Sequence, residues 1–197
     1  MRQVALPLGC ILAIACAKQE APPPAQRPSG PARGTPEWKI ENARSAAPVE
    51  IGTGATVLDW PTSETAAPVQ LTSGTNGWTC FPDDPTTPAN DPGCLNAEAM
   101  TWFNAMLKHQ PPHVSTTGVV YELQGGMWAS NTDPYKTAPD SGQRWNFTPP
   151  FVVIIAANPR AAFAGWPTTP DGGGPWVMFA GTPYAHLMVP VSRGATP

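Results

Sequence analysis

A hydrolytic triad could be formed by Ser130 as nucleophile, Asp133 as carboxylate and His186 as base. Such a triad is defined by geometry in space and not by order along the chain. Little else in the sequence supports a triad. No Gly-x-Ser-x-Gly turn surrounds Ser130, and a histidine on a buried strand is more often a hydrogen-bonded structural residue than a base. The segment from Ser130 to Asp133 can equally be a turn whose side chains satisfy its own backbone. Convergence of the three side chains in one cleft would distinguish these interpretations.

His186 could also bind a metal ion together with a carboxylate. The possible partners are Asp59, Glu122 and Asp133. His109 and His113 have the four-residue spacing of a helical metal pair, but the prolines between them prevent a shared helical face. No metal or cofactor motif is specific, so we expect neither a metal site nor a cofactor.

The tryptophans suggest a different class of function, ligand binding without catalysis. Six of them mostly lie beside turns or Gly/Pro segments, where an indole either packs a loop on the core or forms the wall of a binding site. They are Trp60, Trp78, Trp128, Trp145, Trp166 and Trp176. We take Trp78, Trp128 and Tyr184 as candidate ligand contacts. A loop-rich domain without a catalytic motif favours a binding or interaction module.

Composition excludes two classes of partner. The chain has 197 residues, a net charge of −3 and only 13% charged residues. Proteins that bind nucleic acid or an anionic membrane surface present concentrated positive charge, so we expect no nucleic acid and no direct membrane contact. The 27 prolines and 18 glycines predict long loops, whereas 41% hydrophobic residues are sufficient for the core of one domain of about 150 residues.

Residues 1–16 have the organisation of a bacterial export signal. Met1-Arg2 is followed by a mainly apolar run over residues 4–15, which is too short to span a bilayer as a helix. Residues 12–16 resemble the lipobox of bacterial lipoproteins, with Ala13 at the position where leucine is usual. That resemblance implies lipidation of Cys16; the alternative is ordinary signal cleavage, which gives a periplasmic or secreted protein. Residues 17–36 contain six prolines and predict a disordered tether between anchor and domain.

Cysteine usage agrees with export. Cys10 is removed with the signal and Cys16 is the lipid candidate, so Cys80 and Cys94 remain to form a disulfide. In the chain-entropy account, closing a loop of about 15 residues contributes about 3 kcal/mol. Two cysteines without a nearby histidine do not form a zinc site.

Apolar periodicity predicts the elements of a single domain over residues 49–192, preceded by a short helix over 37–48 and followed by a tail over 193–197. Expected strands cover residues 56–60, 69–72, 78–81, 118–124, 144–147, 151–156, 176–180 and 184–189. The Asn76-Gly77 pair predicts a hairpin between the second and third of these strands. The strand over 184–189 is apolar on both faces, so we expect it inside a sheet that is covered on both sides.

One amphipathic helix is expected over residues 95–109. Asn96 is a good N-cap, and prolines after residue 110 end the helix. Its apolar stripe is Met100, Phe103, Met106 and Leu107, with Trp102 at the edge, and we expect it to pack in the core. A stub helix should begin at Asn158-Pro159. The fold class is therefore α+β, with a mainly antiparallel sheet, one helix packed on it, long loops and one disulfide.

Several strings resemble a family of bacterial exported proteins to which no activity is assigned. They are GTNGWTCFPD (74–83), CLN (94–96), ASNTDP (129–134) and GGPWVMFAGTPYAHLMVPV (173–191). The similarity covers residues 45–191 and implies one exported domain, without implying a reaction. We therefore expect a cell-envelope domain that acts by binding or interaction on an unknown envelope ligand or protein, and keep a hydrolase or metal-dependent enzyme around His186 as the alternative.

Overall fold

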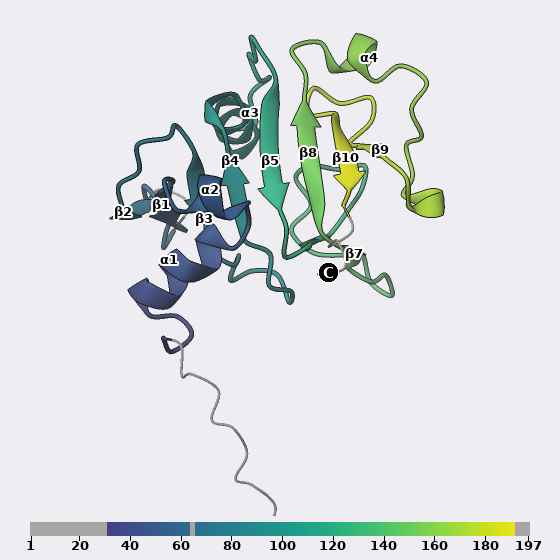
Figure 1. Cartoon of the computed structure of the whole chain (residues 1–197). Coiled ribbons are helices and arrows are strands. Elements are labelled where there is room, and N and C mark those ends of the chain that lie inside the picture. Colours follow the sequence, from purple (N-terminus) through teal and green to yellow (C-terminus); the bar gives the residue numbers. More distant parts are fainter. Residues whose placement is uncertain (1–30, 64–65, 192–197) are drawn as a thin grey trace, which may run out of the picture.

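The computed structural model describes residues 31–63 and 66–191 of the chain (Figure 1). The predicted signal peptide with Cys10 and Cys16, most of the tether and the tail from residue 193 lie outside these residues. Within the described ranges, no helix has both the length and the apolarity needed to cross a bilayer.

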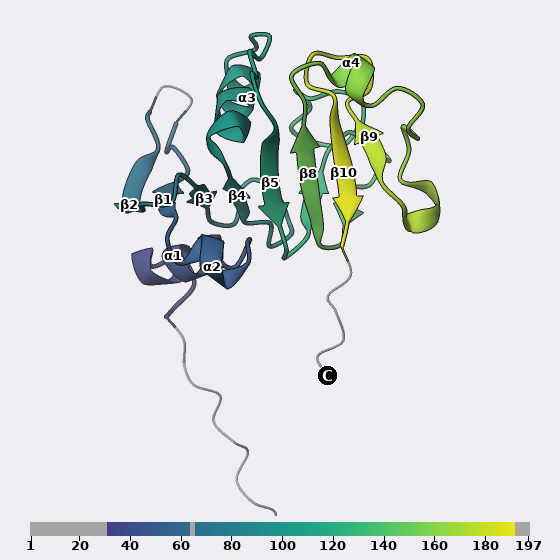
Figure 2. The ribbon, with the colours of Figure 1, turned by 45° about the horizontal axis from the view of Figure 1, so that its top comes forward.

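Eight short strands form the main sheet, in the order β2-β1-β3-β4-β5-β8-β10-β9 (Figure 2). All neighbours are antiparallel except β1 and β3, which are parallel. The strands are β1 (Thr56–Asp59), β2 (Val69–Thr72), β3 (Thr79–Phe81), β4 (Gly93–Leu95), β5 (Gly118–Glu122), β8 (Phe151–Ile155), β9 (Trp176–Met178) and β10 (His186–Pro190). Strands β6 (Gly126–Trp128) and β7 (Asn146–Thr148) pair separately. The predicted α+β class and mainly antiparallel sheet are confirmed.

Helices cover both faces of this sheet. α1 (Pro36–Arg44) and α2 (Val49–Gly52) lie on the opposite side from α3 (Ala97–Leu107), as Figure 2 shows. α1 contacts β1 to β4, whereas α3 contacts β4 and β5. The short helices α4 (Pro159–Ala162) and η1 (Asp171–Gly173) belong to the long connection before β9. Because side chains alternate along a strand, each strand contributes to both layers. In β4, Cys94 joins the core under α1 and Leu95 joins the core under α3.

The runs expected to be most buried do occupy the interior of the sheet. β8 lies between β5 and β10, and β10 lies between β8 and β9. His186, Leu187 and Met188 are all buried. Met188 faces the core under α3, and Leu187 faces a second apolar cluster with Val177. The prediction of a strand covered on both faces is confirmed.

The predicted hairpin between β2 and β3 is wrong, because β1 lies between them. Asn76 is used instead in a crossing loop: its Nδ2 donates to the Ile51 carbonyl oxygen at 2.8 Å, and its Oδ1 accepts from Trp78 N at 3.1 Å. Gly74 passes so close to β1 that a Cβ there would lie 2.1 Å from Thr56 N. The loop is therefore held by contacts with a strand and a helix that are remote in sequence, which a local turn signal does not record.

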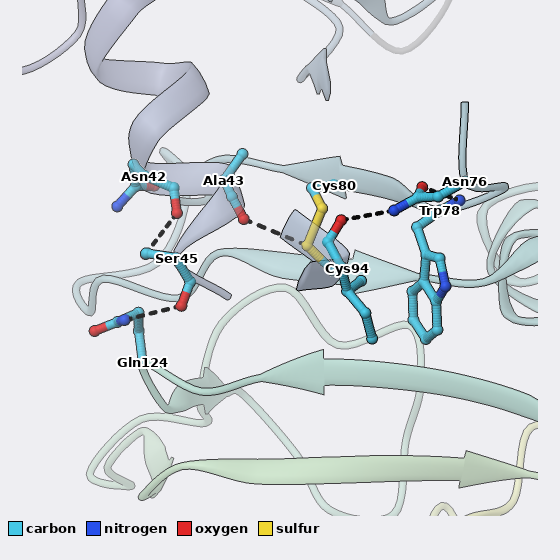
Figure 3. Close-up of a disulfide and its surroundings, with 9 residues drawn as sticks. Asn42, Ala43, Ser45, Asn76, Trp78, Cys80, Cys94 and Gln124 are labelled. Atoms are coloured by element: carbon cyan, nitrogen blue, oxygen red, sulfur yellow. Dashed lines mark hydrogen bonds between the residues drawn. A yellow bond between two sulfur atoms is a disulfide. The ribbon is translucent and has the colours of Figure 1, made fainter. Parts of the chain in front are cut away.

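The predicted disulfide is present. Cys80 and Cys94 face each other across β3 and β4, and both are fully buried beneath α1 (Figure 3). Cys94 Sγ lies 3.4 Å from the carbonyl oxygen of Ala43 in α1. β4 itself was not predicted; its three residues carry too short a pattern to distinguish from the preceding Pro/Asp/Thr loop.

α3 begins as expected, with Asn96 Oδ1 accepting from Ala99 N at 2.9 Å. The same oxygen accepts from Val119 N at 3.0 Å, so the cap also ties the helix to β5. Met100, Phe103 and Met106 of the predicted apolar stripe pack against the core, as expected. Ala99 and Trp102 are the buried residues of α3, whereas Leu107 is 59% exposed and its assignment to the core is wrong. The helix ends over a cavity and not over a continuous core, which leaves its last turn less covered.

Candidate functional site

A cavity of about 340 Å³ lies on the α3 side of the sheet. Its walls come from β3, β4, β5, β8, β9 and β10 of the sheet, from α3, and from the segments 84–91 and 127–137. Seven aromatic side chains dominate the lining: Trp60, Phe81, Trp102, Phe103, Trp128, Trp145 and Phe179. This size and apolar character are typical of sites for small molecules.

His186 lies on β10 at one end of this cavity. It is 4% exposed, and its ring meets Trp102 and Phe179 edge to face, at 5.2 and 5.4 Å between ring centroids. Nδ1 lies 2.9 Å from the Tyr184 carbonyl oxygen. Because a carbonyl only accepts, we assign the proton to Nδ1 and a lone pair to Nε2. Burial lowers the pKa of His186 from 6.5 to about 4, outweighing that backbone bond, so the imidazole is neutral near pH 7.

Glu122 lies in the same cavity but at its other end. Glu122 shares a row of the sheet with Phe151 and Pro190, and His186 is four residues along β10 from Pro190. Four residues of strand span about 13 Å and two strand spacings about 10 Å, which separates the two backbone positions by about 16 Å. Side chains on one face of a sheet stand roughly parallel. Glu122 and His186 therefore do not converge on one metal ion.

Burial and a neighbouring carboxylate control the ionisation of the Glu122 end. Glu122 is 9% exposed, and burial raises its pKa well above the usual 4.5, with a further contribution from the negative charge of Asp91. Burial also raises the pKa of Asp91 to about 6, although hydrogen bonds from Thr87 and from the backbone of Asp84 oppose this. Within the described residues, no hydrogen bond is made by the Glu122 carboxyl group.

The absence of a side chain at Gly126 leaves the space that the Glu122 carboxyl group fills. A Cβ at Gly126 would lie 2.5 Å from Glu122 Oε2 and 2.9 Å from Trp128 Cζ2. A Cβ at Gly93 would lie 3.7 Å from Glu122 Cγ, which is ordinary van der Waals contact, so the Glu122 side chain does not require a glycine there. The carboxyl group is thus held beside an indole ring and in contact with backbone, which explains why burial dominates its pKa.

Two of the indoles in the cavity wall have buried N–H groups without an acceptor. Across the ranges that the structure describes, Trp102 Nε1 and Trp128 Nε1 have no hydrogen-bond partner. Leaving a buried donor unpaired costs about 1–3 kcal/mol, so native structures contain few of them. Both indoles belong to residues of the cavity wall, and their Nε1 atoms are inaccessible to solvent, so only a rearrangement of the side chains would give them an acceptor.

The predicted triad residues share this cavity without forming a triad. Ser130 Oγ accepts from Thr132 N at 3.1 Å and Asp133 N at 3.0 Å, and Asp133 Oδ1 accepts from Tyr135 N at 2.9 Å. These are the bonds of a self-satisfying turn. In the described part of the chain, no hydrogen bond links His186 to either residue. Phe179 N donates to the Asn131 carbonyl oxygen at 2.9 Å, which fastens this turn over the His186 end.

Of the three residues predicted to contact a ligand, only Trp128 lines the cavity. Trp78 packs against Tyr121 on the α1 side of the sheet, with ring centroids 5.4 Å apart. Tyr184 is buried, and its hydroxyl donates to the Gln110 carbonyl oxygen at 2.8 Å, so it is a structural residue.

The other candidate residues lie in different parts of the fold. Trp60 and Trp145 line the cavity, Trp176 is buried in the core and Trp166 is exposed. Asp59, a possible metal ligand, forms an ion pair with Lys39 at 2.6 Å. No cluster of three or more His, Cys, Asp or Glu side chains suited to a metal ion occurs among the residues described.

Sequence reasoning missed Asp91 as part of this site. It lies in a Pro/Asp/Thr loop, and its proximity to Glu122 arises only when β4 inserts between β3 and β5. Glu122 carries a weak signal, because alternation along β5 puts it on the same buried face as Val120.

No protein-family model, no curated protein and no solved structure matches the chain.

Proposed function

We propose that this chain is an exported cell-envelope domain that binds a small, largely apolar molecule in the cavity between the sheet and α3. The observation that supports it most directly is the cavity of about 340 Å³, which is walled by aromatic rings and contains buried polar groups without partners. Such a site provides area for an apolar ligand and a few polar groups to orient it.

Export is the second part of the proposal. A disulfide between two fully buried cysteines favours an oxidising compartment, because reducing conditions in the cytosol disfavour such bonds. The proposed export signal and Cys16 precede the domain, and a lipid on Cys16 would hold it on a membrane facing the periplasm through the tether of residues 17–36. Without acylation, the protein would be periplasmic or secreted.

The alternative is a hydrolase that uses His186. It is favoured by the presence of His186, Ser130 and Asp133 in one cavity. It is opposed by the turn, in which Ser130 Oγ already accepts two backbone N–H groups. A histidine with a pKa of about 4 is also a weak general base near neutral pH. Binding therefore fits the geometry better.

A neutral fluorescent probe, N-phenyl-1-naphthylamine, tests the binding site in the full chain. We expect saturable binding with energy transfer from the tryptophans of the cavity wall. Ala129→Phe places a ring into the cavity and should weaken binding at least about tenfold. Ala162→Phe adds the same ring on the exposed α4 and should leave binding unchanged. Equal weakening by the two variants, or no saturable binding, refutes the site.

Two further measurements separate the remaining parts of the proposal. Metabolic labelling with an alkyne fatty acid should be lost in Cys16→Ser and kept in Cys10→Ser; label in neither parent nor variants refutes lipidation. Hydrolysis of p-nitrophenyl acetate that disappears in Ser130→Ala would instead favour the enzymatic alternative.

A further inference from the structure

Acidic groups are in excess in the cavity wall. The lining includes the carboxyl groups of Asp84, Asp91, Glu122 and Asp133 against one cation, Lys136. Lys136 is already paired with Asp140, and His186 is neutral near pH 7. The electrostatic potential of the cavity is therefore negative, and an anionic ligand would be repelled.

The Glu122 end combines a carboxyl group with aromatic surface. Trp128 lines the cavity, and its Cζ2 would lie 2.9 Å from a Cβ at Gly126, a position only 2.5 Å from Glu122 Oε2. Phe151 is fully buried and packs edge to face against Trp128, at 5.9 Å between ring centroids. A carboxylate beside aromatic rings is the arrangement that binds organic ammonium groups, since the ring faces and the carboxylate both attract positive charge.

We propose that the ligand is an organic cation, in which a compact ammonium group lies beside Glu122 and Asp91 and an apolar body lies along the aromatic wall toward His186. This identification rests on the proposed binding function and specifies its ligand. The ammonium group would supply a counter-charge for the Glu122 carboxylate. Glu122 is nine-tenths buried and makes no hydrogen bond among the described residues.

Other ligand classes fit this end of the cavity less well. A hard metal cation requires six or more oxygen ligands, and the residues described hold no suitable cluster. A neutral apolar molecule fits the walls but offers no partner to the Glu122 carboxyl group, which makes no hydrogen bond among the described residues. An ammonium group with an apolar substituent uses both features.

Proton release should accompany binding of such a cation. Burial raises the pKa values of Glu122 and Asp91; the charge of Asp91 raises the pKa of Glu122 further, and the charges of Asp84 and Asp83 raise that of Asp91. The charged groups that face Asp91 are Asp84 and Asp83, and Asp83 is paired with Arg33. An adjacent cation stabilises the ionised carboxylates and lowers both pKa values. Its affinity should therefore increase as pH rises through about 6, where Asp91 titrates.

Benzyltrimethylammonium and its uncharged isostere neopentylbenzene test this in the full chain. Each is used to displace N-phenyl-1-naphthylamine, and the ratio of the two displacement constants gives the cation preference within one protein. At about pH 8 we expect a preference of about tenfold for the ammonium. The preference should shrink at about pH 5. Calorimetry in two buffers of different ionisation enthalpy should show release of about one proton near pH 6.

Glu122→Gln keeps the shape of the side chain and removes its charge, so the cation preference should fall toward one. Asp91→Asn is the second variant, and it should also reduce the preference if Glu122→Gln does not fold. Glu50→Gln makes the same chemical change on the exposed α2 and should keep the parent ratio.

The outcomes distinguish the two proposals. If the naphthylamine binds but the ammonium shows no preference over its isostere, the cation inference is overturned and the proposed function stands. If the preference persists in both carboxyl variants, the placement beside Glu122 and Asp91 is overturned. If the naphthylamine does not bind, the proposed function fails first.

Discussion

Protonation of His186 should reduce the stability of the folded protein at acid pH. Burial lowers its pKa from 6.5 to about 4, so between these values the unfolded chain binds a proton that the folded protein does not. The stability contributed by the neutral imidazole is therefore complete above about pH 6.5 and is lost as pH falls toward 4.

The size of this loss follows from the difference between the two pKa values. At 1.36 kcal/mol for each pKa unit, lowering the pH from 7 to 4 should cost about 3 kcal/mol, with about 2 kcal/mol lost by pH 5. The imidazole is only 4% exposed, so solvent screening removes little of this effect. A loss of this size is a large part of the 5–15 kcal/mol that is typical of a folded domain.

The variant His186→Asn isolates the pH-dependent contribution of the imidazole to the free energy of unfolding. The amide can still donate to the Tyr184 carbonyl oxygen from a position near that of Nδ1, but it cannot gain a proton. Urea unfolding followed by tryptophan fluorescence, with the disulfide intact, gives the free energy of unfolding of both proteins from pH 4 to 7. Removing part of the ring lowers the stability of the variant by a pH-independent amount.

The difference between the two unfolding free energies is the quantity to follow. Asp91 and Glu122 have raised pKa values, so their contributions are complete at low pH and are lost as pH rises, opposite to His186. These contributions are common to both proteins and cancel in the difference. The advantage of the parent over His186→Asn should shrink by about 3 kcal/mol between pH 7 and 4. Parallel profiles would show that the folded protein does not keep His186 neutral.

Three further predictions concern the scaffold, and each is checked by urea unfolding at neutral pH. Replacing Cys80 and Cys94 together by serine should cost about 3 kcal/mol or more, and an unchanged midpoint would contradict a stabilising disulfide. Asn96→Ala removes a cap shared by α3 and β5 and should cost about 1–2 kcal/mol, whereas Asn104→Ala on the exposed face of α3 should cost less than about 0.5 kcal/mol. Gly74→Ala puts a Cβ 2.1 Å from a backbone nitrogen of β1, so a loss of at least about 2 kcal/mol is expected, and full stability would refute that close approach.

The parts of the fold that the sequence predicts are those governed by local chemistry. β8 and β10 are long apolar runs, and both lie in the interior of the sheet. The cap at Asn96 and the stub helix that starts after Asn158 depend on residues within four positions of each other, and both form as expected. The disulfide also followed from counting cysteines once an oxidising compartment was assumed.

Strand order was harder to predict because it depends on contacts between distant segments. The Asn76-Gly77 signal is compatible with a tight hairpin. In the structure, however, Asn76 donates a hydrogen bond to the carbonyl oxygen of Ile51, a residue of α2. A hairpin would place β2 beside β3, but in the sheet β1 lies between these two strands. A two-residue turn signal contains no information about a third strand.

The cavity illustrates the same limit at the level of chemistry. Its acidic end depends on a loop residue, Asp91, a strand residue, Glu122, and the absence of a side chain at Gly126. None of these is unusual by itself in the sequence. Their effect appears only when the sheet removes Glu122 from water, since burial and not a motif raises its pKa. The sequence therefore pointed to His186, whose imidazole is neutral, and to Glu122 only as a possible metal ligand, and it gave no role to the loop residue Asp91 beside Glu122.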